Sequence, residues 1–556
     1  MFMINNIKEK LAQMRRGAEE RAAQRRAQKS NYEYINLTIS PVNIKALGLI
    51  AEETAKKIKV AAIEAKKKKM ALAVFDPNTL ETKKIIKDFE SKGYQVSIFV
   101  VSLIGLKYAW SFYKFVFKKS TQITGKVEIE EEKLAKLKEV LTSLESIKIS
   151  FEKADKEGIK TAEIFEVILA GALANRASDI HFEPGEEQVK LRLRIDGLLH
   201  DVFSKFKKHD YLYLVSRIKL LSRLKLNIHN EPQDGRFTIA LPDKDIEIRT
   251  SILPSEYGET IVLRILDPES IQVGLKELGF RSDDLEIIEK ELGRPNGMIL
   301  NTGPTGSGKT TTLYAFLKHT QKSEIKTITI EDPIEYHLEG VEQTQVDPET
   351  GYTFAGGLRS ILRQDPDMIL VGEIRDLETA EIAMHAALTG HLVFSTLHTN
   401  QASGAVPRLI DIGVKPSIIA PALNLIIAQR LVRQLCQDCK ISQKVDKELE
   451  KKIKRFIEKL PDKIDKNKYK EIKIFQSKGC DKCSDLGYKG RIGIFEFLLM
   501  DKELEKIIAQ EVVGSEIKKI AVASGMITIQ QDGILKVVSG LTTFEEIKRT
   551  TGLIEW

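Results

Sequence analysis

At its centre the chain reads Gly303-Pro304-Thr305-Gly306-Ser307-Gly308-Lys309-Thr310, which satisfies the pattern G-x-x-x-x-G-K-[ST]. A short apolar run, Met298–Asn301, precedes it, and a helical run, Thr311–His319, follows it. Glycines let backbone N–H groups turn toward phosphate oxygens, and the N-terminus of the following helix adds a favourable dipole for the anion. We therefore predict that Gly303 to Thr311 bind ATP, with Lys309 at the β- and γ-phosphates and the Thr310 hydroxyl on Mg²⁺.

Three further apolar runs indicate the architecture around this loop. Thr327–Ile330, Met368–Val371 and Leu392–Ser395 are short and are each followed by polar residues. Their spacing leaves room for crossover helices, so we expect an α/β fold with a parallel sheet covered by helices on both faces.

Acidic residues at strand ends are candidates for Mg²⁺ and for orienting the attacking water, as an ATPase requires. Glu373 ends the apolar run from Asp367 in the manner of a Walker B element, and it is the first candidate. Glu331 and Glu335 follow the preceding strand, at the ligand edge of an open α/β sheet. Both could face the nucleotide, although either could instead cap the next turn.

Two histidines, His391 and His398, bracket the run Leu392–Leu397. A single histidine in such a position is more often structural. Their placement at both ends of an inner strand would let imidazole groups approach a phosphate or a neighbouring domain.

All four cysteines fall in two Cys-x-x-Cys pairs, Cys436 with Cys439 and Cys480 with Cys483. In a reducing cytosol this spacing favours metal binding over disulfides, and four thiolates can close a tetrahedral Zn²⁺ shell. A redox dithiol is the competing interpretation, but one pair would be enough for it. The lysine-rich segment between the pairs, Lys444–Lys473, is weakly patterned, which predicts a solvated excursion.

Changes in pattern along the chain predict five segments. They are a basic helix (1–30), a small α/β domain built on a βαβ unit (31–120), a charged linker (121–150), an α+β domain (151–272) and the nucleotide-binding domain (273–556) with the cysteine insert (436–483).

Composition excludes the disordered and fibrous classes. The 556 residues are 42% hydrophobic and 30% charged, with a mean hydropathy of -0.19, which is typical of a soluble globular protein. Met1–Lys10 lacks the apolar core of a secretory signal, so we expect a cytoplasmic protein. The apolar run Val96–Leu106 is too short to span a bilayer and is interpreted as a core strand leading into a core helix.

Basic clusters raise an alternative function. The net charge is +7, and basic residues cluster on an N-terminal stretch (Arg15, Arg16, Arg21, Arg25, Arg26) and in the run Lys66–Lys69. Such clusters are usually solvated helix faces, but they can contact nucleic acid or an acidic membrane. A ring-forming nucleic-acid translocase is therefore the alternative hypothesis. It ranks lower because the clusters lie outside the nucleotide-binding region.

Several of these motifs together resemble the secretion ATPase superfamily. Ile330–Tyr336, Asp367–Asp376 and Thr389–His398 resemble its Asp box, Walker B box and His box. The resemblance extends to Ala177–Pro184 and Gln233–Phe237, and it covers roughly residues 150–556.

The resemblance implies a PAS-like domain before a RecA-like P-loop domain, with ATP between them and six subunits in a ring. It also implies that Arg249 and Arg264 of the first domain complete the site. Guanidinium groups that neutralise charge on the transferred phosphoryl group can be worth about 10³–10⁵ in rate.

The segment Gly487–Glu496 resembles the one that follows the tetracysteine motif in pilus-extension and secretion ATPases. The resemblance therefore implies an ATPase that powers type IV pilus assembly or type II secretion. The expected partner is an inner-membrane platform protein, through which the motor would be peripheral to the membrane, and no nucleic acid is expected.

Overall fold

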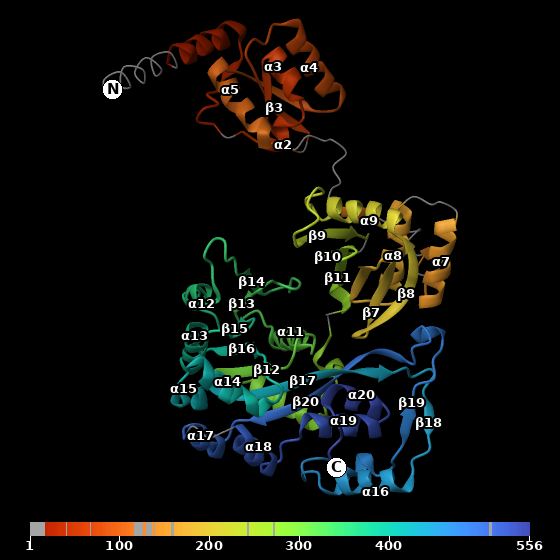
Figure 1. The fold of residues 1–556 in the computed structure, drawn as a ribbon. Coiled ribbons are helices and arrows are strands. Elements are labelled where there is room, and N and C mark those ends of the chain that lie inside the picture. The colour runs from red at the N-terminus through yellow and green to blue at the C-terminus, as the bar shows by residue number, and fades with distance from the viewer. Residues whose placement is uncertain are drawn as a thin grey trace. The chain divides into compact units, whose positions relative to one another are not determined.

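The computed structural model describes residues 17–40, 42–66, 68–115, 126–128, 136–137, 139–156, 161–241, 244–270, 273–510 and 514–556. The chain divides into two compact units, residues 1–122 and 123–556 (Figure 1). Residues 17–30 are helical, as predicted for that part of 1–30. Arg15, Arg16, Lys67 and residues 121–125, 129–135 and 138 of the predicted linker (121–150) lie outside the described residues.

The first unit contains a four-stranded sheet in the order β1-β4-β3-β2, in which only β2 runs antiparallel to its neighbour. The predicted βαβ unit is present as β3, α4 and β4, and β4 leads into α5 as predicted. The Ser102 hydroxyl caps α5 by accepting from the Gly105 N–H at 2.9 Å. The elements are β1 (Glu33–Tyr34), α2 (Ile44–Leu47), α3 (Glu52–Ile58), β2 (Val60–Lys66), β3 (Lys69–Val74), α4 (Leu80–Ser91), β4 (Gln95–Val100), α5 (Leu103–Ser111) and the 3-10 turn Phe112–Phe115.

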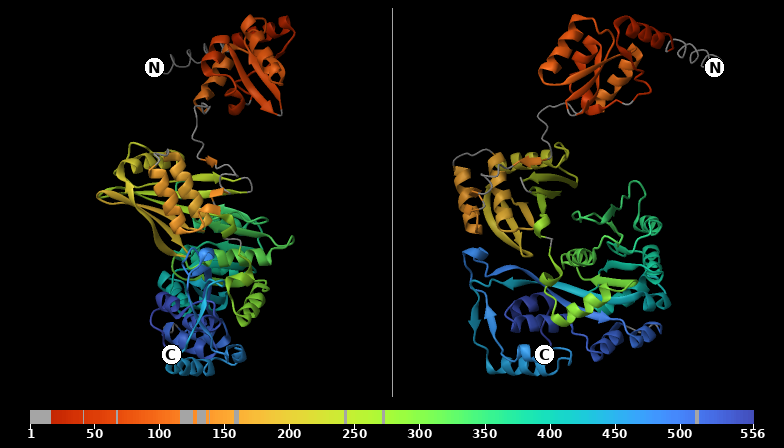
Figure 2. Two further views of the ribbon diagram at one scale, coloured as in Figure 1. Left: turned by 90° about the vertical axis from the view of Figure 1, so that its right-hand side faces the viewer. Right: turned by 180° about the vertical axis from the view of Figure 1, so that it is seen from behind.

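The second unit begins with a mixed seven-stranded sheet in the order β5-β9-β10-β11-β6-β7-β8. Helices α7 and α8 cover one face, as Figure 2 shows, and Phe165, Phe182 and Tyr211 are buried in the core there. The elements are β5 (Lys126–Glu128), α7 (Leu144–Lys156), α8 (Thr161–Ala174), β6 (Asp179–Pro184), β7 (Gln188–Ile195), β8 (Leu198–Lys207), α9 (Lys208–Leu221), β9 (Gln233–Ala240), β10 (Asp245–Ser255) and β11 (Gly258–Leu266).

Strand register aligns arginines on the other face of this sheet. Arg249 on β10 pairs with Arg236 on β9 and with Arg264 on β11. Because side chains alternate along a strand, buried Ile248 faces the core and Arg249 faces away from it. The predicted arginine pair therefore lies side by side on a polar sheet face.

A second seven-stranded sheet follows, in the order β14-β13-β15-β16-β12-β17-β20. Its pairs are parallel as predicted, except that β20 at the edge is antiparallel to β17. Helices α10 and α11 contribute to a core on one face, and α12 to α15 contribute to a core on the other. The central elements are the 3-10 turns Pro268–Ser270 and Leu275–Leu278, α10 (Ser282–Leu292), β12 (Gly297–Thr302), α11 (Lys309–Thr320), β13 (Thr327–Glu331), β14 (Glu342–Gln345), α12 (Phe354–Leu362), β15 (Met368–Val371), α13 (Leu377–Leu388), β16 (Leu392–Leu397), the 3-10 turn Ala402–Gly404, α14 (Ala405–Ile412), α15 (Pro416–Ala422) and β17 (Leu423–Leu435).

The segment between the cysteine pairs is more ordered than its weak pattern predicted. It contains helix α16, which begins after the capping side chain of Asp446 and buries Ile453, Phe456 and Ile457. The remaining elements are β18 (Ile441–Gln443), α16 (Lys447–Glu458), the 3-10 turn Lys466–Tyr469, β19 (Ile474–Gln476), the 3-10 turn Asp481–Cys483, β20 (Tyr488–Leu499), α17 (Lys502–Ile508), α18 (Gly514–Ala523), α19 (Ile529–Val538) and α20 (Phe544–Thr551). Among the described residues, no helix combines the length and the apolar character needed to cross a membrane.

A buried charge cluster joins α10 to α19. Asp532 is fully buried and accepts from Arg281 at 2.7 Å and from the Phe495 N–H at 2.8 Å. Lys536 pairs with the same carboxylate at 2.5 Å, and Arg281 also donates to Asp284 at 2.6 Å. Two buried cations therefore depend on one carboxylate for much of their compensation.

We predict that Asp532→Ala destabilises the second unit by about 3–5 kcal/mol, because it leaves Arg281 and Lys536 buried without this partner. The measurement is the midpoint of urea unfolding. Asp462→Ala is the control: its side chain is exposed and its ion pair with Lys466, at 3.5 Å, is a surface pair worth about 0–1 kcal/mol. Equal midpoints for the two variants would contradict a supporting role for the cluster.

Candidate nucleotide site and cysteine cluster

The predicted phosphate loop lies between β12 and α11, at the carboxyl edge of the second sheet. Gly306 and Gly308 have φ values of 76° and 88°, in the left-handed region that favours glycine. A Cβ on Gly308 would lie 2.9 Å from Nε2 of Gln429 on β17. Both the backbone and the close strand therefore require glycine there.

Lys309 is held against its own loop. Its Nζ donates to the carbonyl oxygens of Gly303 at 2.8 Å and Pro304 at 3.3 Å. Burial lowers the pKa of Lys309 to about 8, an effect that nearby Glu373 opposes and Arg430 reinforces. No carboxylate of the described residues lies within ion-pairing distance of the Lys309 ammonium. An anionic ligand would therefore supply the missing countercharge.

The hydroxyls of the loop also suit a phosphate ligand. Ser307 Oγ is buried and has no hydrogen-bond partner among the described residues. Thr310 is exposed at the first turn of α11, and Thr311 is half-buried. An orphaned hydroxyl, an unpaired ammonium and a free helix N-terminus fit the phosphates and Mg²⁺ of a bound nucleotide.

Residues of the predicted Walker B, Asp and His boxes lie together around Glu373. The Glu373 carboxylate follows β15, pairs with Arg375 and lies 3.3 Å from Nε2 of His398. Arg375 also reaches Asp332 at 3.5 Å. The predicted residues Glu373 and His398 are thus brought together, and they follow strands at the same carboxyl edge of the sheet as Lys309.

Glu331 occupies a different environment from the one expected. Its buried carboxylate accepts from Tyr314 Oη, from Thr329 Oγ1 at 2.6 Å and from Gln343 Nε2 at 3.1 Å. Burial raises the pKa of Tyr314, and the neighbouring Glu331 raises it further. Both carboxylate oxygens are engaged, so in this arrangement Glu331 fixes α11 to β13 and β14 rather than facing a ligand.

His391 is likewise not brought to the loop. It precedes β16, whose first residue pairs in parallel with Gly297 at the start of β12. The loop follows the other end of β12, roughly 20 Å along the strand. Within one subunit, Nδ1 of His391 instead lies 3.0 Å from the carbonyl oxygen of Ala386.

The two predicted arginines bond to acids. Arg249 reaches Glu335 at 3.2 Å and donates to the Ile334 carbonyl at 3.0 Å, whereas Arg264 donates to Asp179 at 3.0 Å. Both line a cavity of about 1020 Å³ that the phosphate loop does not line.

A smaller cavity, of about 410 Å³, lies at the loop itself. It is lined by Gly308 and Thr311 of the loop and by residues of the preceding domain, such as Arg176 and Ile265. This cavity joins the phosphate loop to the preceding domain.

Sequence reasoning missed two residues of β17. The Gln429 amide accepts from Asn301 at 2.8 Å and from Thr312 at 2.9 Å. Arg430 is half-buried beside the loop and bonds to Asn400 at 2.9 and 3.1 Å. Their signal was two adjacent polar residues directly after the apolar run Leu425–Ala428 of the strand.

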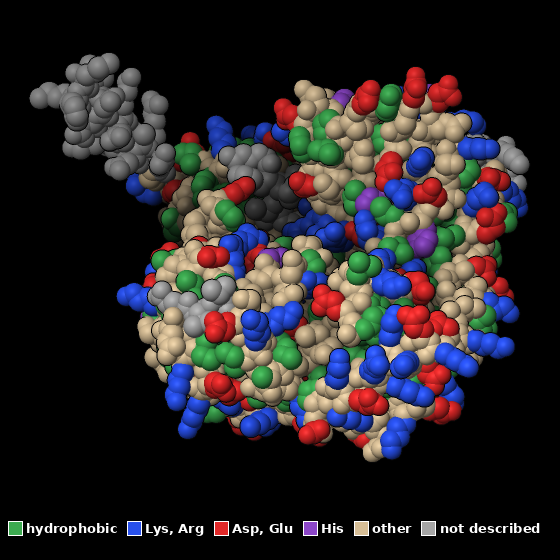
Figure 3. Space-filling model, turned by 60° about the horizontal axis from the view of Figure 1, so that its bottom comes forward, with side chains coloured by type: hydrophobic (Ala, Val, Ile, Leu, Met, Phe, Trp, Pro, Cys, Tyr) green, Lys and Arg blue, Asp and Glu red, His purple; other side chains and the backbone are tan. Residues whose placement is uncertain are grey.

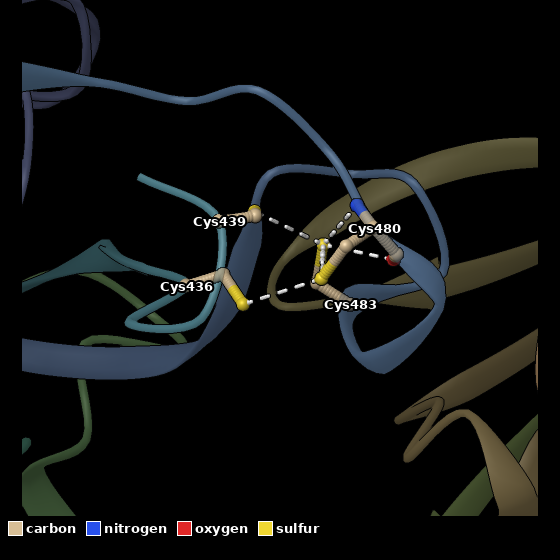
Figure 4. Close-up of side chains that lie close together, drawn as sticks. All are labelled: Cys436, Cys439, Cys480 and Cys483. Atoms are coloured by element: carbon tan, nitrogen blue, oxygen red, sulfur yellow. Dashed lines mark hydrogen bonds between the residues drawn. The ribbon is translucent and has the colours of Figure 1, made fainter. Parts of the chain in front are cut away.

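The four cysteines converge, as Figure 4 shows. Sγ–Sγ distances are 3.9 Å for Cys436 to Cys480, 3.8 Å for Cys439 to Cys483 and 3.7 Å for Cys480 to Cys483. Tetrahedral Zn²⁺ with Zn–S bonds of about 2.3 Å requires sulfurs about 3.8 Å apart. The donor set therefore fits zinc.

The cluster also contacts the preceding domain. Ser484 Oγ lies 2.8 Å from the Thr142 carbonyl and 2.7 Å from Asn175 Oδ1, and the Gly490 N–H donates to Asp196 at 2.8 Å. Residues that follow the second cysteine pair thus bond to the neighbouring sheet domain.

Comparison with known proteins gives the family. The family model described as type II/IV secretion system protein matches residues 153–549. The chain belongs to this family. The type II secretion system ATPase E of Vibrio cholerae is 43% identical over 389 residues, which are 70% of this chain and 75% of that protein.

Other relatives extend the likeness. The type IV pilus assembly ATPase PilB of Myxococcus xanthus is 35% identical over 525 residues, or 93% of this chain and 88% of that protein. The solved structure of the Yersinia pseudotuberculosis ATPase DotB aligns with a TM-score of 0.51 at 20% identity, over 70% of this chain and 92% of that one. The predicted membership in the secretion ATPases and the α/β character are confirmed.

We predict that Cys480→Ser removes bound zinc and lowers the temperature of thermal unfolding by several degrees, because a structural zinc site contributes folding free energy. Zinc is measured per chain by elemental analysis, and unfolding by calorimetry. Ser442→Ala, on exposed β18, is the control. Wild-type protein that contains no zinc as purified, or a Cys480→Ser variant that unfolds at the wild-type temperature, would contradict the site.

Proposed function

We propose that this chain is the ATPase subunit of a six-membered ring that powers type IV pilus assembly or type II secretion. Family membership supports the ATPase activity. The single observation that carries the site is Lys309, a half-buried ammonium whose hydrogen-bond acceptors are carbonyls and which has no ion pair among the described residues. A nucleoside triphosphate would supply the anion that this position requires.

The proposed nucleotide position lies between two domains of the second unit. The phosphates would contact the Gly303–Thr311 loop, and the remainder would extend into the cavity that Gly308 and Thr311 share with Arg176 and Ile265. The two domains would correspond to the PAS-like and RecA-like domains of the family, at 151–272 and 273–556.

Hydrolysis is assigned to the cluster around Glu373. Thr310 and Glu373 would hold Mg²⁺, whose charge would offset that of the phosphates. Glu373 is positioned by Arg375 and His398, so its carboxylate can orient a water near Lys309. Arg430 adds a second cation beside the loop.

Force would come from a change of partner by Arg249. It is bonded to Glu335 in this conformation, and a bound phosphate offers a stronger anion for its guanidinium. Exchange of Glu335 for phosphate would draw the arginine face of one domain toward the loop of the other. Differential binding of ATP and ADP then biases the two domain arrangements.

The platform protein of a pilus or secretion machine is the proposed recipient of this motion, at the cytoplasmic face of the inner membrane. The family model matches residues 153–549, a range that includes most of both proposed motor domains.

We predict that Glu373→Gln lowers kcat for ATP hydrolysis about 10²-fold or more while nucleotide binding persists, because the carboxylate acts on water and metal rather than on the whole nucleotide. Lys309→Ala should abolish both. ATPase assays and calorimetric binding of a non-hydrolysable analogue provide the two readouts.

The matched control is Glu378→Gln, an exposed acid on α13 that pairs with Arg359 and lies five residues from Glu373. It should hydrolyse ATP at the wild-type rate. Unchanged hydrolysis in both Glu373→Gln and Lys309→Ala would remove the proposed mechanism.

A further inference from the structure

The segment between the cysteine pairs carries most of the net charge of the chain. Residues 444–478 contain thirteen Lys or Arg and seven Asp or Glu, which gives +6 of the total of +7. This excess is concentrated in a folded element, α16, and the loops beside it. The positions of these charged side chains are therefore defined by the fold.

Helix α16 separates its apolar and basic residues. Ile453, at the centre of the helix, is fully buried. Lys447, Lys451 and Arg455 recur every four residues on the opposite face, and all three are exposed. We call these three side chains the α16 ridge.

The ridge cations lack ion pairs, unlike their neighbours on the same helix. Lys452 and Lys454 pair with Glu448 and Glu450 at 2.7 and 2.6 Å. Within the part of the chain that the structure describes, no carboxylate lies within ion-pairing distance of a ridge side chain. The same holds for five exposed lysines of the adjoining loops: Lys444, Lys459, Lys463, Lys470 and Lys478.

This region is at the bottom of Figure 1 and is turned forward in Figure 3, where Lys and Arg side chains project from the lower part of the surface. No large apolar side chain of α16 is exposed. The face therefore offers unpaired positive charge without an element that could insert into a lipid bilayer. Attraction to it would be electrostatic.

We propose that the α16 ridge rests on the surface of an anionic lipid membrane. A charged bilayer presents negative groups across a plane and requires no register, which suits cations that recur every four residues along a helix. The one aromatic residue of α16, Phe456, is buried, so the ridge has no platform on which nucleic-acid bases could stack. A direct lipid contact goes beyond attachment through a partner protein and does not depend on ATP hydrolysis.

The test is co-sedimentation of the full chain, without nucleotide, with vesicles of phosphatidylglycerol and phosphatidylcholine, compared with phosphatidylcholine alone. We expect binding to the anionic vesicles that is lost at high salt, because the Debye length falls to about 3 Å at 1 M. Each cation near such a surface strengthens binding about fivefold. The triple variant Lys447→Gln/Lys451→Gln/Arg455→Gln should therefore bind roughly a hundredfold more weakly.

The matched control is Lys83→Gln/Lys84→Gln/Lys87→Gln, which removes the same charge from an exposed face of α4. It should bind like the wild type. Circular dichroism and the ATPase rate report whether either variant is misfolded. Equal losses in the two variants, equal binding to both kinds of vesicle, or tighter binding to a short DNA duplex than to anionic vesicles would overturn the proposal.

Discussion

A half-buried ammonium that has carbonyl partners but no ion pair among the described residues is the constraint on which the rest of this structure depends. Lys309 can remain charged at neutral pH because two carbonyl oxygens of its own loop accept from it, and burial has already lowered its pKa to about 8. The residues around Lys309 shape the loop and hold its flanking strand and helix in place. Left-handed glycines shape the loop, and Gln429 joins the β12 strand, through Asn301, to the α11 helix, through Thr312.

In the proposed mechanism, the preceding domain supplies positive charge that the loop would need during hydrolysis. The arginines of β10 and β11 lie on one sheet face, but in this conformation they bond to Glu335 and Asp179 instead of to the loop. An ion pair between domains that phosphate can replace is a simple way to convert ligand charge into movement. Ser484 and Gly490, which follow the second cysteine pair, bond to residues that precede the nucleotide-binding domain.

Much of this was accessible from sequence because local patterns determine it. The Met368–Val371 strand, the turn from strand to helix before Lys309 and the convergence of the two cysteine motifs were predicted where they occur. The position of His391 could also have been inferred: a residue before a parallel strand lies at the edge opposite to a loop that follows its neighbour. The environment of Glu331 could not, since its partners Tyr314 and Gln343 come from a helix and a strand that only tertiary packing brings together. The amphipathic face of α16 was obscured by the abundance of lysine.

The most direct test of this account is the pH dependence of binding of a non-hydrolysable ATP analogue, measured by calorimetry at constant ionic strength from pH 7 to 10. Nucleotide requires the charged form of Lys309, whose pKa in the free protein is about 8, so affinity should be constant below that pH and fall about tenfold per unit well above it. Lys309→Arg, which stays charged, should bind with an affinity that does not change over this range. A wild-type affinity that is flat to pH 10 would contradict the central role of the lysine.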